Sequence, residues 1–529
     1  MTISPVTNVD ADVAVVGSGF AGSLIALALR KRNRRVVLVE RGRHPRFVIG
    51  ESSTPLANLL IEELADRYDL PRIRAFSKWG TWQQTHPGVG VGLKRGFTFY
   101  FHRLDETFED DDRHGRQLLV AASPHDDIAD THWYRPDFDH ALVRAAADEG
   151  AIYLDATRLD RIRLEGNRTT LEGTREGRSV RISAGFVVDA TGTRGFLHNT
   201  LRLQDAPCRW LPPTQGLFTH FADVERWDRL MPSYAAPPYP VDAAALHHVF
   251  PGGWIWMLRF NNGLTSAGAA LTDPLANALG ASEGKAAWER LMARLPSVGA
   301  QFRWARPVLP FVHTPRVAFR SHQVVGESWA LAPSAVGVID PLLSTGFPLA
   351  LLGIHRLLDV LERTTAGPER QHALQEYERV TLSELDATER LVAALYATMT
   401  DPPLFKKLSL LYFAAASFSE AVRRLGKPAL APGFLLSAHP DFAPELAACS
   451  LAAMGAPAGH ERDALLDRID RAIEPFDSAG LLDRDRHDWY PVLASDLLAS
   501  AAKLEAAEPE IDRLLERCGF GHTSLRSRP

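Results

Sequence analysis

Two tryptophans at alternate positions, Trp254 and Trp256, follow a glycine pair near the middle of the chain. Side chains at positions i and i+2 of a β-strand point to the same face of a sheet. The two indoles therefore predict a broad aromatic wall that shapes a closed space between a cofactor site and a substrate site. The same spacing is also typical of an ordinary sandwich core built from large hydrophobic residues.

A glycine-rich turn near the amino terminus follows an apolar run at residues 13–16 and precedes a predicted helix at residues 23–30. A second apolar run, residues 36–39, ends at Glu40. In a dinucleotide-binding unit, glycines let a pyrophosphate approach the helix N-terminus, and the acidic residue binds a ribose. With both strands and the acid in register, the spacing predicts a dinucleotide cofactor. The residues expected to hold it are Gly17, Gly19, Ala21, Gly22, Glu40 and Arg41.

The chain has 529 residues, of which 46% are hydrophobic and 23% charged, as expected for a globular enzyme with a large core. Its formal net charge of -5 gives no electrostatic reason to expect nucleic acid or an anionic membrane as a partner. No apolar run reaches the length of a membrane span, and the amino terminus lacks the features of a secretory signal. Because the three cysteines are widely spaced, we expect a cytoplasmic protein without a metal centre.

Three narrower motifs accompany the glycine turn: residues 252–256 with the two tryptophans, residues 340–346, and residues 92–97 around Lys94. Together they resemble the flavin-dependent halogenases, a family within the aromatic-hydroxylase-like flavoproteins. Residues 44–53 are similar to a run found in the pyrrole-chlorinating halogenases of pyrrolnitrin biosynthesis, the monodechloroaminopyrrolnitrin halogenase type.

The resemblance implies an α/β fold with a Rossmann-type FAD-binding domain. We expect the FAD-binding and halogenase core at residues 10–365, with a β-rich substrate part at about residues 200–325. A Gly-Pro break is followed by segments rich in alanine, leucine and charged residues, which predict a helical C-terminal region at residues 366–529. The resemblance does not extend to that region.

The family's chemistry implies roles for a lysine and for the two tryptophans. A separate flavin reductase supplies FADH2, and oxygen with chloride or bromide yields hypohalous acid, which reaches a lysine beside the substrate. The resemblance implies Lys94 for this role, with Lys78 as the second candidate and an ordinary surface lysine as the alternative. A buried ammonium loses solvation, which lowers its pKa. Trp254 and Trp256 would keep the substrate away from the flavin.

The loop at residues 340–346 is the implied halide site, where the backbone N–H groups of Thr345 and Gly346 would hold the anion. A plain strand-to-helix turn, capped by the side chains of Ser344 and Thr345, remains an alternative. The other cofactor-binding residues implied by the resemblance are Ser52, Ser53, Arg135, Asp189, Gly192, Asp340 and Gly346.

Leu343 departs from the halogenases of free tryptophan, which carry a glutamate at this place to orient the indole. Leucine cannot polarise a substrate, so we expect one that is already activated: a phenol, a pyrrole or an aminophenyl-pyrrole. Glu51 is a nearby carboxylate whose role, in substrate chemistry or in loop structure, the sequence leaves open.

Further positions differ from the pattern or leave choices open. Arg259 stands where the family motif ends in proline, and it either binds an anionic substrate group or, as we favour, pairs with a carboxylate. Residues 332–335 lack the acid that the wider group places on the ribityl chain, which implies looser flavin binding. His247 and His248 are adjacent on a predicted strand, so at most one faces the substrate.

The sequence therefore predicts a reductase-dependent flavin halogenase that acts on a small electron-rich aromatic compound in secondary metabolism. The alternative is a single-component flavin monooxygenase that binds NADPH itself, and a non-catalytic descendant is a third possibility. The identity of the substrate, and whether it is free or tethered to a carrier protein, are left open.

Overall fold

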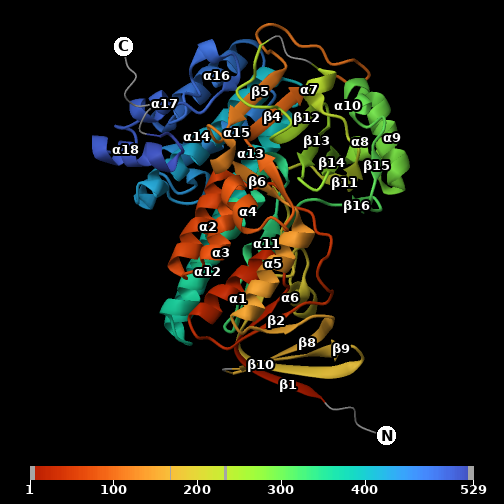
Figure 1. The fold of residues 1–529 in the computed structure, drawn as a ribbon, viewed down its shortest axis with the longest axis vertical. Helices are drawn as coiled ribbons and strands as arrows, with labels where there is room; N and C mark the ends of the chain where they lie inside the picture. The colour runs from red at the N-terminus through yellow and green to blue at the C-terminus, as the bar shows by residue number, and fades with distance from the viewer. Residues whose placement is uncertain (1–5, 167, 232–234, 522–529) are drawn as a thin grey trace.

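The computed structural model describes residues 6–166, 168–231 and 235–521. A seven-stranded sheet and a nine-stranded sheet lie toward opposite ends of the molecule, and helices pack between and around them (Figure 1). The predicted α/β fold is confirmed, with a Rossmann-type unit, a β-rich part and a mainly helical C-terminal region.

The seven-stranded sheet is formed by β1 (Thr7–Val16), β2 (Val36–Val39), β7 (Ile152–Leu154), β8 (Thr157–Glu165), β9 (Arg168–Arg175), β10 (Arg178–Asp189) and β18 (Trp329–Leu331). Its order is β7-β2-β1-β10-β9-β8, and β18 also pairs with β10. The central strands pair in parallel, which explains their continuous apolar runs, because such strands are buried on both faces. β1 begins earlier than the predicted run because it pairs with β10 along its whole length.

Three helices pack together over this sheet: α1 (Phe20–Lys31), α5 (Arg135–Asp148) and α12 (Gly346–Arg363). All residues of α1 from Phe20 to Leu29 are buried, so the helix is covered on every side. α1 begins three residues before its predicted start, within the glycine turn, and α12 begins at Gly346, the last residue of the 340–346 loop.

The nine-stranded sheet contains β4 (Gly96–Phe101), β5 (Gln117–Ala121), β11 (Thr214–Ala222), β12 (Ala245–Phe250), β13 (Gly253–Arg259), β14 (Leu264–Thr272), β15 (Arg306–Pro307), β16 (Val312–Thr314) and β20 (Trp489–Tyr490). Its main path is β15-β11-β14-β13-β12-β4-β5-β20, with β16 on β11. β20 belongs to the C-terminal region, which is therefore not wholly helical. It extends the sheet by pairing in parallel with β5.

The C-terminal helices gather around the end of the molecule that holds the nine-stranded sheet (Figure 1). They are α13 (Pro368–Ala397), α14 (Pro402–Arg424), α15 (Phe442–Met454), α16 (Gly459–Ile473), α17 (Ala494–Ala499) and α18 (Glu508–Arg517). Proline occupies the first helical position of α13 and α14, where its missing N–H costs nothing. Aromatic residues of α14 pack on Phe97, Phe99 and Phe101, which share one face of β4.

The opposite face of β4 packs on a second group of helices. Tyr100 lies 4.9 Å, between ring centroids, from Trp227 of α7 (Trp227–Leu230). α8 (Asp273–Leu279), α9 (Lys285–Arg294) and α10 (Pro296–Gln301) complete this layer. The nine-stranded sheet is therefore buried on both faces.

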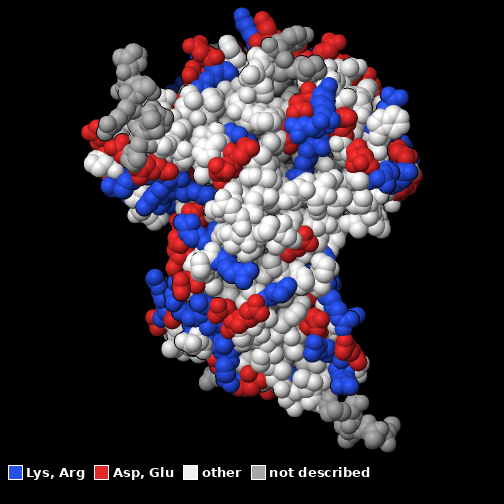
Figure 2. Space-filling view, viewed as in Figure 1, with Lys and Arg blue, Asp and Glu red and all other residues white. Residues whose placement is uncertain are grey.

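The remaining elements join the two sheets. The helices are α2 (Pro55–Arg67), α3 (Pro71–Arg74), α4 (Trp79–Thr85), α6 (Phe196–Thr200) and α11 (Pro333–Val336). The short strands are β3 (Val91–Lys94), β6 (Asp130–Trp133), β17 (Phe319–Arg320) and β19 (Gly337–Val338). Within the described residues, no helix is both long and apolar enough to cross a bilayer. Lys and Arg are interspersed with Asp and Glu on the face shown in Figure 2.

A glycine in β14 makes room for the tryptophan wall. Gly268 is the cross-strand partner of Trp256 on one side and of Phe218 on the other. A Cβ atom at this position would lie 2.3 Å from the indole of Trp256 and 2.3 Å from the Cβ of Phe218. The position of the Trp256 ring therefore depends on the absence of a side chain at residue 268.

We expect Gly268→Ala to lower the free energy of unfolding by about 1–3 kcal/mol, because the added methyl overpacks the sheet. Chemical denaturation followed by tryptophan fluorescence measures this difference. Gly88→Ala is the matched control, since a Cβ there meets nothing within 4 Å, and its effect should stay within about 0.5 kcal/mol. Equal effects of the two substitutions would contradict the packing role of Gly268.

Candidate active site

A large cavity of about 1440 Å³ lies between the end of β1, the start of α1, β13 and the start of α12. It brings together most of the site residues predicted from the sequence. The predicted residues that line it are Gly17, Gly19, Ala21, Glu40, Arg41, Ser52, Arg135, Gly192, Trp254, Trp256, Asp340, Thr345 and Gly346. Four further predicted residues lie outside the lining, namely Gly22, Ser53, Lys94 and Asp189.

The glycine turn has the geometry that a pyrophosphate needs. Gly17 has a φ of 98°, and a Cβ there would lie 2.6 Å from the carbonyl oxygen of Ala190. At Gly22, a Cβ would lie 1.9 Å from the carbonyl oxygen of Gly17, so this glycine lets the helix approach the turn. Gly19 begins α1 without a side-chain cap, which leaves the helix N-terminus available to an anion.

Glu40 is buried at the end of β2 and is held as a carboxylate. Its Oε2 accepts hydrogen bonds from the N–H of Ser18 at 3.2 Å and from Arg46 at 3.1 Å, and its Oε1 accepts from the N–H of Gly42 at 2.9 Å. Burial raises its pKa, but the charge of Arg46 and these hydrogen bonds hold the pKa below the usual value. The ionised group fits a ribose hydroxyl.

Two arginines flank the open start of α1. The guanidinium of Arg135 donates to both oxygens of Asp139, at 2.7 and 2.9 Å, and to the carbonyl oxygen of Gly50 at 2.8 Å. The predicted Arg135 and the unpredicted Arg46 both have an Nη2 atom within 4 Å of the position that a Cβ of Gly19 would take. This pair of cations suits the phosphates of a dinucleotide.

Asp189 supports the cavity from behind its wall. Its carboxylate accepts hydrogen bonds from the N–H of Thr191 at 2.8 Å and of Leu197 at 2.6 Å, and burial raises its pKa. Asp189 thereby fixes the turn that carries Gly192 into the lining.

The two tryptophans form the predicted wall on one side of the large cavity. Their ring centroids are 5.7 Å apart, and both side chains are almost fully buried. Trp254 donates to the hydroxyl of Tyr396 at 3.2 Å, and that hydroxyl donates to Asp340 Oδ2 at 2.9 Å. Burial raises the pKa of Asp340 to about 6. Tyr396 lies in α13, so the C-terminal region contributes directly to this wall.

The loop before α12 has two consecutive left-handed residues, Leu343 at a φ of 63° and Ser344 at a φ of 55°. Thr345 is the residue before α12, at its N-cap position, but no side chain caps the helix, so the predicted capping by the side chains of Ser344 and Thr345 is wrong. A Cβ at Gly346 would meet nothing within 4 Å. The uncapped helix start at the cavity therefore suits an anion.

Lys94 is completely buried at the end of β3, so it is not the surface lysine of the alternative interpretation. Its Nζ donates to Ser52 Oγ at 3.0 Å and to the carbonyl oxygen of Ser53 at 2.5 Å, and it lies 3.7 Å from the ring centroid of Phe97. Burial lowers the pKa of Lys94, although the nearby charge of Asp130 acts in the opposite direction.

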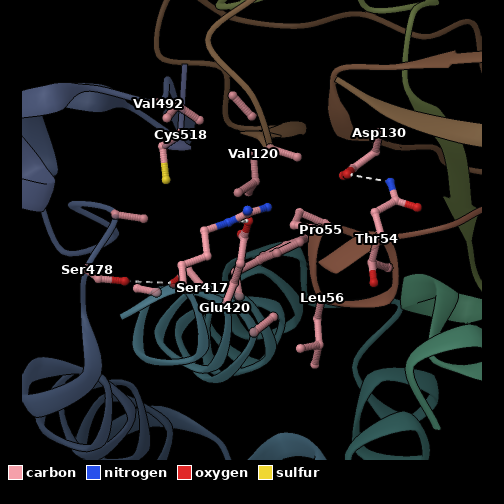
Figure 3. A pocket seen from close by; sticks show the side chains of 18 of the residues that line it. Thr54, Pro55, Leu56, Val120, Asp130, Ser417, Glu420, Ser478, Val492 and Cys518 are labelled. Atoms are coloured by element: carbon pink, nitrogen blue, oxygen red, sulfur yellow. Dashed lines mark hydrogen bonds and ion pairs between the residues drawn. The ribbon is translucent and has the colours of Figure 1, made fainter. Parts of the chain in front are cut away.

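A small cavity of about 130 Å³ is lined by two neighbours of Lys94, Phe97 and Asp130, the second of which is labelled in Figure 3. Lys94 lines neither cavity itself, but it contacts Phe97 of the small cavity and Ser52 of the large one. Helix α14 and segments near α17 and α18 form much of the wall, which the sequence did not indicate. Lys78, the second candidate, also lines the small cavity, but its Nζ lies 3.7 Å from Glu62.

The adjacent histidines face opposite sides of the nine-stranded sheet, as predicted. His247 lines the large cavity and stacks on Phe99 at 4.4 Å. His248 lies in the other layer, where its Nδ1 is 2.9 Å from His102 Nε2 and its Nε2 is 3.0 Å from Gln301 Oε1. Burial lowers the pKa of both His247 and His248 to about 3, so both rings are neutral at pH 7.

Arg259 pairs with a carboxylate, as the sequence favoured. Its Nε lies 2.9 Å from Asp242 Oδ1, and its terminal nitrogens donate to the carbonyl oxygens of Val224 and Glu225. Glu51 is buried in the wall of the large cavity, with Oε1 at 2.8 Å from Nε2 of His220.

Comparison with known proteins agrees with this geometry. Residues 12–331 match the family model described as FAD dependent oxidoreductase. The monodechloroaminopyrrolnitrin halogenase PrnC of Pseudomonas fluorescens is 31% identical over 400 residues, which cover 74% of this chain and 68% of that protein. The tetracycline 7-halogenase of Kitasatospora aureofaciens is 29% identical over 419 residues, covering 77% of this chain and 73% of that protein.

A crystal structure of the halogenase PltM in complex with phloroglucinol and FAD has the same fold, with a TM-score of 0.82 at 24% identity. The similarity covers 90% of this chain and 99% of that one, and so includes most of the C-terminal region. Given the family match and the identity to PrnC over more than two thirds of both proteins, the chain belongs to the flavin-dependent halogenases, within the FAD-dependent oxidoreductases.

Proposed function

We propose that this halogenase makes hypohalous acid in the large cavity and uses it, through Lys94, on a small aromatic substrate bound in the small cavity. The observation that carries the proposal is the fully buried ammonium group of Lys94, which contacts Ser52 of the large cavity and Phe97 of the small one. Burial of a charged group destabilises a fold. We therefore infer that the buried ammonium group of Lys94 is retained for its function.

FAD, when bound, supplies the oxidising chemistry, and the residues of this chain bind and orient it. Gly17, Gly19, Arg46 and Arg135 are suited to its phosphates, and Glu40 is suited to its ribose. Supporting evidence is the size of the large cavity and the uncapped start of α1.

The halide is proposed to bind at the uncapped start of α12, against the N–H groups of Thr345 and Gly346. Trp254 and Trp256 are proposed to keep the aromatic substrate out of the large cavity, so that only the small oxidant passes. The neutral state of His247 at pH 7 supports this, since it adds no competing charge to the wall.

The substrate is proposed to be a single electron-rich ring of the phenol or pyrrole type. The volume of the small cavity, about 130 Å³, is close to that of an apolar cavity of about 150 Å³ that binds benzene in another protein. Leu343 is buried and apolar, so it cannot activate a poorly reactive ring. Relatives include a chlorinase of 1H-pyrrole-2-carbonyl-[peptidyl-carrier protein], so a carrier-tethered pyrrole is to be tested beside the free compounds.

A separate flavin reductase in the same cytoplasm is the proposed partner. Pro333 and Ser334 line the large cavity at the place where the wider group has an acid, which supports weak, exchangeable flavin binding. The proposed division at residues 365 and 366 describes two parts that act together, because Thr381 and Leu385 of α13 line the large cavity and α14 lines the small one.

We expect Lys94→Met to lower the rate of bromination by at least about 100-fold, because the group proposed to hold the oxidant near the substrate is removed. The assay combines the protein with a flavin reductase, NADH, oxygen, bromide and a panel of phenols and pyrroles, with products measured by mass spectrometry. FAD affinity, measured by fluorescence titration, should remain unchanged.

Lys406→Met is the control for loss of a buried lysine, since Lys406 pairs with Asp488 and donates to the carbonyl oxygen of Gly115, away from the linings of both cavities and from Ser52 and Phe97. Its bromination per folded molecule should stay near that of the parent protein. Undiminished bromination by Lys94→Met would remove Lys94 from the proposal.

Asp340 makes stability depend on pH. Burial raises its folded-state pKa from 3.8 to about 6, so between these values the folded protein holds a proton that the unfolded chain has lost. Stability therefore falls as the pH rises through this window. Asp340→Asn should be more stable than the parent at pH 7.5, by on the order of 1–3 kcal/mol, and the difference should shrink below about pH 4.

Urea denaturation at pH 4.5 and 7.5 measures this pH dependence. Asp242→Asn is the control, because that buried carboxylate is already paired with Arg259 and its loss should destabilise the fold at pH 7.5. A constant difference between Asp340→Asn and the parent at both pH values would contradict the raised pKa of Asp340.

A further inference from the structure

A short chain of hydrogen bonds fixes the carboxylate that lies opposite Lys94. Asp130 is the cross-strand partner of Lys94 in the β3–β6 ladder. Its Oδ1 accepts from Asn58 at 2.9 Å, and Asn58 Oδ1 accepts from the hydroxyl of Ser53 at 2.8 Å. Because the carbonyl oxygen of Ser53 accepts from Lys94, the two charged groups are held by one connected set of residues.

The second oxygen of Asp130, Oδ2, is buried and has no hydrogen-bond partner among the described residues. Asp130 is 5% exposed, lines the small cavity, and points toward it from the side of β6 in Figure 3. Lys94 donates instead to Ser52 Oγ and to the carbonyl oxygen of Ser53. A buried carboxylate oxygen without a donor is costly, so this one is suited to a donor from a ligand.

The other carboxylates that line the small cavity already have partners. Glu420 Oε1 accepts from Arg424 Nε at 2.8 Å, beside the centre of Figure 3. Asp496 accepts from Arg486 with both oxygens, at 2.7 and 2.9 Å. Asp130 is thus the carboxylate of this cavity that retains an oxygen for a substrate. Burial also raises the pKa of Asp130, although the charge of Lys94 lowers it, so the group is suited to exchange a proton.

We propose that Asp130 selects and orients the substrate, by accepting a hydrogen bond from a hydroxyl or N–H group carried on a single aromatic ring. This inference rests on the proposed function, because it takes the small cavity as the substrate site. It assigns the substrate class as one-ring hydroxyarenes or pyrroles with a free donor. It also gives the ring an activating carboxylate, which Leu343 cannot provide.

The proposed step balances for a phenol and hypohalous acid. The ring carbon takes the halogen, so the carbon–halogen bond forms and the oxygen–halogen bond breaks. The phenol proton passes to Asp130, and the hydroxide released takes a proton from the ammonium of Lys94 and leaves as water. The halogenated carbon then gives its proton to the amine of Lys94, and Asp130 returns its proton to the ring oxygen. Both residues end as they began, and the products are the halogenated phenol and water.

Two matched probes test the hydrogen bond: resorcinol, which has donors, and 1,3-dimethoxybenzene, which is also electron-rich but has none. The measured quantity is the ratio of their kcat/KM values for bromination, compared with their rate ratio toward free hypobromous acid in buffer. In the parent protein we expect the enzyme ratio to exceed the free ratio by at least about 10-fold. In Asp130→Asn it should fall to the free ratio, because the ionised acceptor is gone.

Glu420→Gln is the matched control, since it changes a carboxylate of the same cavity that already has a partner. We expect it to keep the parent ratio. A parent-like ratio in Asp130→Asn, or collapse of the ratio in Glu420→Gln, would overturn the assignment. If Asp130→Asn does not fold, as judged by thermal unfolding, Asp130→Ala takes its place with the same expected outcome.

Calorimetric titration of resorcinol into the protein without turnover separates this inference from the proposed function. We expect Asp130→Asn to weaken resorcinol binding by about 10-fold or more, and to leave the binding of 1,3-dimethoxybenzene unchanged. Asp130-dependent binding without any bromination by the parent protein would overturn the proposed function alone. Bromination by the parent with no effect of Asp130→Asn on binding or on the ratio would overturn the role of Asp130 alone.

Discussion

The ammonium group of Lys94 is removed from water, and the surrounding residues offset part of the free energy that this desolvation costs. The hydroxyl oxygen of Ser52 and the carbonyl oxygen of Ser53 accept its hydrogen bonds, and the ring centroid of Phe97 lies 3.7 Å from its nitrogen. These contacts depend on three elements beside Lys94: β6, which pairs with β3, the segment before α2, which carries the two serines, and β4, which carries Phe97. A buried charge with incomplete compensation destabilises a fold, and this is why we propose a function for the amine.

Large, rigid aromatic side chains form one wall of the large cavity. Trp254 and Trp256 stand on one face of β13, and Gly268 in the neighbouring strand leaves space for the second indole. Tyr396 from α13 accepts from Trp254 and donates to Asp340. The wall is thus fixed by hydrogen bonds to a distant part of the chain, and the C-terminal region becomes part of the active site rather than an appendage.

The dinucleotide-binding unit and the tryptophan strand could be predicted because their information is local. Glycine positions set backbone geometry directly, and alternate residues in a strand must share a face. The pairing of Arg259 and the opposite facing of His247 and His248 followed from equally simple rules. The capping predicted for Ser344 and Thr345 was wrong because neither side chain bonds to the backbone at the start of α12, although Thr345 occupies the N-cap position.

Arg46, Asp130 and Tyr396 were missed because their roles arise only from long-range packing. Arg46 meets Glu40 through a loop, Asp130 meets Lys94 across a strand pair, and Tyr396 reaches Asp340 from a helix without a motif. No spacing or motif in the sequence predicts such contacts. The similarity of residues 44–53 to the pyrrole-chlorinating halogenases was a signal for Arg46, but it marked the whole segment and gave this arginine no role of its own.

The most direct test is a crystal structure of the protein with FAD and resorcinol bound together. We expect the flavin in the large cavity, the resorcinol ring in the small cavity with a hydroxyl on Asp130, and Lys94 between them. A resorcinol ring stacked on the flavin, on the same side of Trp254 and Trp256, would contradict the proposed separation of oxidant and substrate.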